Sequence, residues 1–159
     1  MVFYLDTSAA AKLVVAESGS EAMASWAAAH ETQVIASDLL RTELLRATRR
    51  VAPDRMERAR SVLDAITLFN LPSTTFERAA TLDHDELRSL DALHLAAAME
   101  LGDELEGIVT YDDRMAGAAN RYGFAVIAPS RSCFPGDVYP PASSDRHRVL
   151  ARSQSRRYG

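Results

Sequence analysis

The chain has 159 residues, of which 47% are hydrophobic, and this is enough for one substantial core and a single domain. Its formal charge of −4 is unevenly spread, because residues 131–159 carry six arginines against two aspartates and are net +4, which leaves residues 1–130 at net −8. An acidic body excludes a protein that holds nucleic acid by charge alone, since that mode needs a Lys/Arg surface. It leaves open a site that meets phosphate through a metal ion.

Cysteine content and hydropathy narrow the class further. Cys133 is the single cysteine, which excludes an intrachain disulfide and a multi-thiolate zinc site and fits a reducing compartment. No basic segment precedes the short apolar run at the N-terminus, and no stretch reaches the roughly 18 apolar residues of a membrane span. We therefore expect a soluble, cytoplasmic protein with no membrane partner.

The first stretch, VFYLDTS, predicts a strand, an acid and a helix start in succession. Residues 2–5 are apolar without interruption, as in a strand buried on both faces of a parallel sheet, and Asp6 follows. Thr7 and Ser8 suit a helix start, since hydroxyl side chains accept hydrogen bonds from the first N–H groups. Ligands of open α/β sheets bind at the carboxyl ends of strands, so Asp6 is a candidate site residue. On this stretch alone, a solvated turn or capping residue is the equal alternative.

Strands and helices alternate from there to about residue 129. Apolar runs predict strands at 2–5, 33–36, 67–71, 107–111 and 124–128. Helical spacing of apolar residues predicts helices at 9–16, 20–30, 38–51, 56–66, 73–82 and 90–101, with a last one that ends at Gly123. This pattern predicts a three-layer α/β/α fold with a five-stranded parallel sheet.

The composition changes after residue 129. Residues 130–159 are rich in Pro, Ser and Arg and poor in apolar residues, so they cannot bury much surface. We expect a folded domain over 1–129 and a tail over 130–159 that is loosely packed or disordered, with a short helix near 146–153 as the exception.

Four carboxylates occupy places that are unusual for solvent-exposed surface acids. Asp6 and Asp112 close the first and fourth predicted strands, Glu43 borders the apolar row of its helix, and Asp91 begins a helix with hardly any polar face. Burying an unpaired carboxylate is costly, so these acids need cationic partners such as Lys12, or a metal ion. Oxygen-only ligands suit Mg²⁺ or Mn²⁺, the hard cations that phosphodiester hydrolysis uses.

The remaining polar groups carry weaker signals. The four histidines are scattered and form no zinc pattern, and His94 is interpreted as a hydrogen-bonded residue of the buried helix rather than a ligand. The arginines of the helix at 38–51 are expected to face solvent or a polyanion; they are Arg41, Arg46, Arg49 and Arg50.

Four motifs in order now resemble one family, the PIN-domain proteins, and specifically VapC-type toxins of bacterial toxin–antitoxin pairs. The motifs are YLDTSAAAK at 4–12, RTELLR at 41–46, SLDALHLAAA at 89–98 and VTYDDRM at 109–115. The resemblance covers roughly residues 1–129. It implies a five-stranded parallel sheet, a Mg²⁺- or Mn²⁺-dependent endoribonuclease that cleaves an RNA substrate, a homodimer, and a cognate VapB-type antitoxin that blocks the site.

The resemblance also implies roles for particular residues. The acidic quartet that holds metal and carries out cleavage corresponds here to Asp6, Glu43, Asp91 and Asp112. Thr7, Ser8 and Thr110 match the hydroxyl positions that support these acids. Asp113 stands where many relatives have a non-acidic residue, and is either an outer ligand or a helix cap, with the cap favoured.

Two other functions are compatible with parts of this pattern. A phosphatase of the haloacid-dehalogenase kind also begins with a strand that ends in an acid, but it needs a second Asp two residues later, where this chain has Ser8. A non-catalytic domain of the same fold would only bind a partner, and would have no need for all four acids. Saturable binding of a divalent metal separates the nuclease from the binding module.

Overall fold

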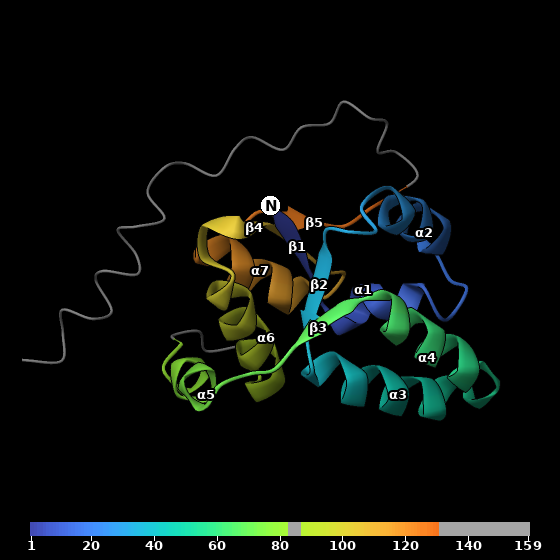
Figure 1. The fold of residues 1–159 in the computed structure, drawn as a ribbon, viewed down its shortest axis with the longest axis horizontal. Helices are drawn as coiled ribbons and strands as arrows, with labels where there is room; N and C mark the ends of the chain where they lie inside the picture. The colour runs from blue at the N-terminus through green and yellow to red at the C-terminus, as the bar shows by residue number, and fades with distance from the viewer. Residues whose placement is uncertain (83–86, 131–159) are drawn as a thin grey trace, which may run out of the picture.

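The computed structural model describes residues 1–82 and 87–130 (Figure 1). The predicted tail lies outside the described residues except for Ser130, and its loose packing stays a prediction.

Five parallel strands form one sheet in the order β3-β2-β1-β4-β5. They are β1 (Val2–Leu5), β2 (Val34–Ser37), β3 (Thr67–Phe69), β4 (Leu105–Val109) and β5 (Val126–Ile127). The predicted five-stranded parallel sheet is confirmed, although four strands differ from the prediction by one or two residues, the third at one end and the others at both ends. The fourth strand ends at Val109 rather than at residue 111, because the N–H groups of Tyr111 and Asp112 donate hydrogen bonds to side-chain hydroxyls instead of to a neighbouring strand.

Helices fill the connections between the strands. They are α1 (Thr7–Lys12), α2 (Ser20–Ala29), α3 (Leu39–Val51), α4 (Met56–Ala65), α5 (Ser73–Ala80), α6 (Ser89–Glu100) and α7 (Asp113–Arg121). Two short 3₁₀ turns lie at Pro53–Arg55 and Gly102–Glu104. The predicted bounds of the first helix, 9–16, were wrong, because Asp6 caps the helix two residues earlier and the regular turns end at Lys12.

Alternate side chains of β1 show why the sheet is covered on both faces. Leu5 is buried in a core that includes Leu40 of α3, whereas Tyr4 is buried in a second core with Leu95 of α6 and Met115 of α7. Figure 1 shows α1 to α4 on one side of the sheet and α5 to α7 on the other. The predicted three-layer α/β/α architecture is therefore confirmed.

The strand order reverses between β1 and β4. β1 continues to β2 and β3 on one side, while β4 and β5 lie on the other. The two central strands pair in register, with Leu5 opposite Val109, so Asp6 and Thr110 leave the sheet side by side. Ligands bind at such a switch point in open α/β sheets, at the carboxyl ends of the strands.

Candidate active site

Asp6 lies at the end of β1 and is the N-cap of α1. One of its oxygens, Oδ2, accepts hydrogen bonds from the Ser8 hydroxyl at 2.6 Å, the Thr110 hydroxyl at 2.8 Å and the Ser8 N–H at 3.2 Å. Asp6 is only 7% exposed. The predicted cap at Thr7 or Ser8 was wrong, because the Asp6 carboxylate accepts the N–H of Ser8, the second helical residue.

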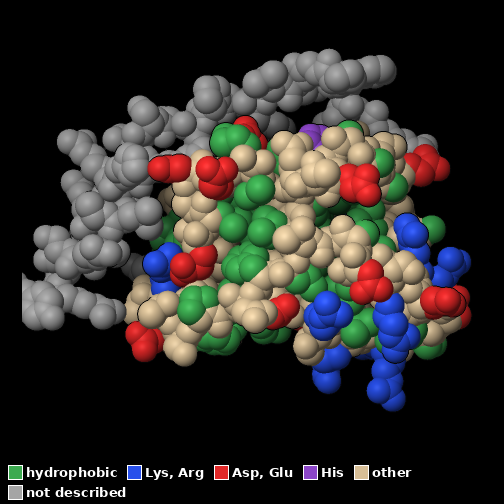
Figure 2. Space-filling model, in the orientation of Figure 1, with side chains coloured by type: hydrophobic (Ala, Val, Ile, Leu, Met, Phe, Trp, Pro, Cys, Tyr) green, Lys and Arg blue, Asp and Glu red, His purple; other side chains and the backbone are tan. Residues whose placement is uncertain are grey.

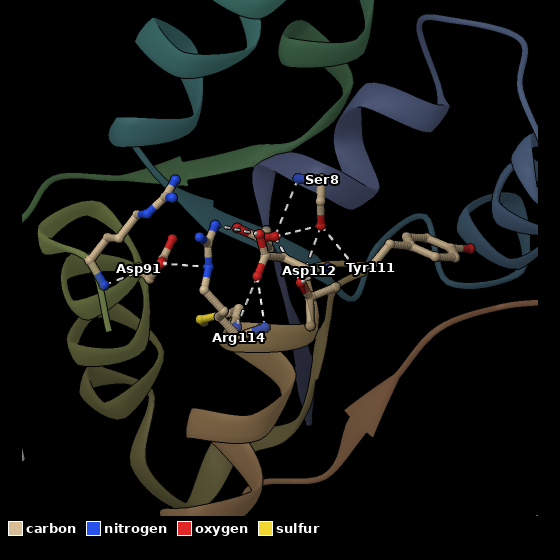
Figure 3. A network of polar contacts seen from close by, with 9 residues as sticks. Ser8, Asp91, Tyr111, Asp112 and Arg114 are labelled. Atoms are coloured by element: carbon tan, nitrogen blue, oxygen red, sulfur yellow. Dashed lines mark hydrogen bonds and ion pairs between the residues drawn. The ribbon is translucent and has the colours of Figure 1, made fainter. Parts of the chain in front are cut away.

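The two hydroxyls that hold Asp6 are themselves oriented by the backbone after β4. Ser8 Oγ accepts from the Tyr111 N–H at 2.9 Å, and Thr110 Oγ1 accepts from the Asp112 N–H at 3.1 Å (Figure 3). Each hydroxyl therefore accepts from the main chain and donates to Asp6. This arrangement joins the ends of β1 and β4 and fixes the direction of the Asp6 carboxylate.

Glu43 reaches the same region from α3. Its Oε2 atom accepts a hydrogen bond from the Thr7 hydroxyl at 2.7 Å and also contacts Nε2 of His94. Burial alone would raise the pKa of Glu43, but the hydrogen bond and charge of His94, with the Thr7 hydroxyl, outweigh it and hold the pKa below its usual value. Thr7 therefore supports Glu43, whereas Ser8 and Thr110 support Asp6.

His94 is the hydrogen-bonded core residue that the sequence predicted, but its contact with Glu43 was missed. It is 2% exposed, and its Nδ1 atom lies 2.7 Å from the Tyr4 hydroxyl. Burial lowers the pKa of His94, whereas the hydrogen bond to Glu43 and the nearby carboxylates raise it by more, so the net shift is upward. The available signal was spacing, because His94 follows Asp91 by three residues and shares its side of the helix.

Asp91 lies in the first turn of α6, where it accepts a hydrogen bond from the Arg88 N–H at 3.3 Å. Arg88 is the N-cap of this helix, which begins at Ser89. Burial raises the pKa of Asp91, and the negative charges of Asp112 and Asp6 raise it further. The Arg88 N–H and the positive charge of Arg114 lower it by less, so the net shift is upward. The upward shift of the Asp91 pKa thus comes first from burial and then from the neighbouring like charges, which the Arg114 charge only partly offsets.

Asp112 follows β4 and caps α7. Its Oδ1 atom accepts from the N–H groups of Arg114 at 2.8 Å and Met115 at 3.2 Å. Burial alone would raise the pKa of Asp112, but those N–H groups and the Arg114 guanidinium lower it. The prediction that Asp113 is the cap was wrong, because Asp113 is the first helical residue and is exposed.

Arg114 lies between Asp91 and Asp112 and was missed in the sequence, although it stands inside the motif VTYDDRM (Figure 3). Its Nη2 atom donates to Asp112 Oδ2 at 3.2 Å, and its Nε atom lies 3.9 Å from Asp91 Oδ2. The Nε atom is buried without a hydrogen-bond partner in the described structure. Arg114 therefore neutralises the two acids without being fully satisfied itself.

Glu43, Asp91, Asp112 and Arg114 line one cleft of about 1250 Å³, whereas Asp6 is not among its lining residues. Its acidic lining residues are Glu43, Asp91 and Asp112, and its basic ones are Arg46, Arg49, Arg50, Arg88 and Arg114. Figure 2 shows Lys and Arg side chains gathered at the lower edge of the molecule, where α3 lies in Figure 1. Lys12, the suggested partner for an acid of the site, pairs instead with Glu17 at 3.0 Å.

The donor set fits a hard cation by its chemistry, since it consists of carboxylate and hydroxyl oxygens. No described residue donates a hydrogen bond to Oδ1 of Asp6 or Oε1 of Glu43. Over 1–82 and 87–130, no three His, Cys, Asp or Glu side chains are already gathered as a metal cluster. The positive charge between Asp91 and Asp112 comes from Arg114, which would compete with a metal for both.

Comparison with known proteins gives the class of this molecule. The family model of the PIN domain matches residues 3–120. Crystal structures with the same fold include Mycobacterium tuberculosis VapC20, described as a sarcin–ricin loop cleaving toxin, at 17% identity and a TM-score of 0.65, covering 80% of this chain and 99% of that one. PAE2754 from Pyrobaculum aerophilum matches with a TM-score of 0.52 at 16% identity, over 74% of this chain and 79% of that one. The chain belongs to the PIN-domain family.

Curated relatives narrow this to the VapC branch. Ribonuclease VapC47 of M. tuberculosis is 37% identical over 80% of this chain and 97% of its own length. Ribonuclease VapC35 is 39% identical over 82% and 99%, and ribonuclease VapC46 is 40% identical over 80% and 97%, both also from M. tuberculosis. The resemblance to VapC-type PIN toxins that the four motifs indicated is therefore confirmed.

Proposed function

We propose that the protein is a metal-dependent endoribonuclease and the toxin of a toxin–antitoxin pair. One observation carries the proposal: Asp6 and Asp112 follow the two central strands and their charges act on Asp91, while the charges of Asp6, Glu43 and Asp91 act on His94. The ribonuclease names of the VapC47, VapC35 and VapC46 relatives support the same activity.

Asp6, Asp91 and Asp112 would hold Mg²⁺ or Mn²⁺, and Glu43 would hold a second ion or orient the attacking water. A bound ion neutralises the scissile phosphate and lowers the pKa of that water. Ser8 and Thr110 fix the direction of Asp6, as outer hydrogen bonds commonly do for metal ligands. One carboxylate accepts the proton of the water, and cleavage leaves 5′-phosphate and 3′-hydroxyl ends.

The arginines of the cleft suit a polyanionic substrate. Arg46, Arg49 and Arg50 on α3 line the same cleft as three of the acids, Glu43, Asp91 and Asp112. Because phosphate contacts supply most non-specific affinity for nucleic acid, this row would hold the RNA backbone while the acids act on one phosphodiester. A local basic wall thus reconciles the acidic body of the chain with an acidic substrate.

Several features of the proposal concern the whole molecule. Residues 1–129 would form the nuclease domain, a VapB-type antitoxin would block its cleft, and the active form would be a homodimer in the cytoplasm. Within the described ranges, no helix is both long and apolar enough to cross a membrane. A haloacid-dehalogenase-like phosphatase is disfavoured because Ser8 fills the position of its second acid and donates to Asp6.

The test uses an isosteric substitution. Purified Asp6→Asn should lose Mg²⁺- and Mn²⁺-dependent cleavage of labelled RNA, and its expression should no longer be toxic, while its thermal unfolding stays cooperative. Asp64→Asn, at an exposed acid of α4, is the matched control and should cleave like the wild type. Undiminished cleavage by Asp6→Asn would overturn the site assignment.

A calorimetric titration with Mn²⁺ separates the enzyme from a binding module, because only the enzyme requires saturable metal binding. Mapping the ends of cellular RNA after a pulse of expression then identifies the target.

A further inference from the structure

We propose that His94, itself held by Tyr4, is a positioning residue that anchors one oxygen of Glu43 so that the other oxygen faces the cleft. This inference rests on the proposed nuclease function, because it assigns a task to Glu43 in that site. It adds two residues that touch neither substrate nor metal.

A continuous row of polar contacts runs from the sheet to Glu43. The Ser37 hydroxyl lies 2.9 Å from the Tyr4 hydroxyl, which lies 2.7 Å from Nδ1 of His94. The opposite ring nitrogen of His94, Nε2, contacts Oε2 of Glu43. The row thus joins β2, β1 and α6 to a side chain of α3.

Burial makes this row rigid at its sheet end and leaves Glu43 as its adjustable end. Tyr4 and Ser37 are fully buried and His94 nearly so. The rings of Tyr4 and His94 also pack edge to face, with centroids 5.8 Å apart. Glu43 has three rotatable side-chain bonds and lines an open cleft, so without a fixed partner its carboxylate would sample several positions.

Both anchoring contacts use the same oxygen of Glu43. Oε2 accepts from the Thr7 hydroxyl and contacts His94, whereas Oε1 accepts from no described residue. An anchor through a single oxygen sets the plane of the carboxylate and leaves the second oxygen available for a metal or water.

The arrangement works with either protonation state of the imidazole. Nε2 can donate to Glu43 in both states, while the Tyr4 hydroxyl can accept from Nδ1 or donate to it, with Ser37 taking the complementary role. The inference therefore depends on where the ring is held and not on its charge.

A purely structural role for His94 gives a different expectation. If the ring only filled the core, activity per folded molecule would be insensitive to which polar side chain replaced it. The two amide residues distinguish these roles, because the amide of Asn overlies Nδ1 of a histidine and that of Gln overlies Nε2.

The experiment compares His94→Asn with His94→Gln in the full chain. For His94→Asn we expect kcat for labelled RNA and the Mn²⁺ affinity measured by calorimetry to fall about 10- to 100-fold, with KM nearly unchanged, as for other residues that orient metal ligands. His94→Gln restores a donor to Glu43 and should stay within a few-fold of the wild type in both quantities. The proposal is overturned if both variants have the same kcat and the same Mn²⁺ affinity, with any remaining difference explained by their thermal stability.

Tyr4→Phe provides a second test if His94→Asn does not fold. It keeps the ring but removes the hydroxyl that holds Nδ1, so kcat should fall by a smaller factor without a matching change in KM. An unchanged kcat in folded Tyr4→Phe would count against the anchor. A wild-type protein that does not cleave RNA would instead refute the nuclease function itself.

Discussion

Asp6 and Glu43 are both anchored through one carboxylate oxygen, but by different donors. In each, a single carboxylate oxygen takes the anchoring contacts and the other receives none from the described residues. The donors to Asp6 are neutral hydroxyls and an N–H group, whereas the principal donor to Glu43 is an imidazole whose pKa is raised. No cationic side chain therefore contacts Asp6 among the described residues, whereas Glu43 contacts the imidazole of His94.

Asp91 and Asp112 form a third arrangement, in which the cation is already present. Arg114 pairs with both, and the Asp91 pKa nevertheless lies above its usual value. Substitutions of the groups that contact these carboxylates can therefore show which of them sets the affinity for metal: the neutral donors to Asp6, the imidazole of His94 or the guanidinium of Arg114.

Among Ser8, Thr7 and Arg114, which contact the carboxylates, the largest effect is expected for Ser8→Ala at the Asp6 anchor. It removes a donor to Asp6 and the acceptor of the Tyr111 N–H in a half-buried place, so the free energy of unfolding should fall by about 1–3 kcal/mol. Mn²⁺ affinity should fall by about tenfold or more, because the direction of Asp6 is no longer fixed. Denaturant unfolding and calorimetry measure the two. Ser61→Ala, at an exposed serine of α4, should leave both unchanged.

Arg114→Met should act in the opposite direction on metal affinity. It removes the cation that competes for Asp91 and Asp112, and a partly exposed pair of this kind is worth up to about 1 kcal/mol, so Mn²⁺ should bind several-fold more tightly at low salt. The metal-free protein should be slightly less stable near neutral pH. Weaker Mn²⁺ binding by this variant would show that Arg114 supports the metal site rather than competing for it.

Thr7→Val tests the neutral donor of the Glu43 anchor. The shape of the side chain is conserved and His94 still holds Oε2, so we expect kcat for RNA to fall by only a few-fold and stability by less than about 1 kcal/mol. If Thr7→Val lowers the free energy of unfolding as much as Ser8→Ala does, the Asp6 and Glu43 anchors are equivalent and the imidazole of His94 contributes little.

The smallest effect is a pH dependence of the metal-free protein. A histidine with a raised pKa in the folded state contributes stability that is fully present below its unfolded pKa of about 6.5 and is lost as the pH rises through the folded pKa. The free energy of unfolding should therefore decrease as the pH rises from about 6.5 through the raised folded pKa of His94, and His94→Gln should lack this decrease. A wild-type curve parallel to that of His94→Gln would exclude the linkage.

The sequence predicted the sheet and its two helical layers, because strand periodicity is a local signal, and it placed Asp6 and Asp112 at the ends of the first and fourth strands for the same reason. It did not predict that Asp112 rather than Asp113 caps α7, since that choice depends on where β4 ends. The Glu43–His94 contact joins residues 51 positions apart, and the Tyr4–His94 contact joins residues 90 apart. Only the packing of α3 and α6 against the same end of the sheet brings those side chains together.

Both strand-end acids have two tasks, because Asp6 and Asp112 each begin the helix that follows their strand. The carboxylate is thereby located by the backbone of two secondary-structure elements, and it cannot shift without unwinding a helix end. Asparagine is as good an N-cap as aspartate, so Asp→Asn at either position removes the charge and keeps the helix start. This chain therefore allows the electrostatic contribution of each acid to be separated from its architectural one by a single substitution.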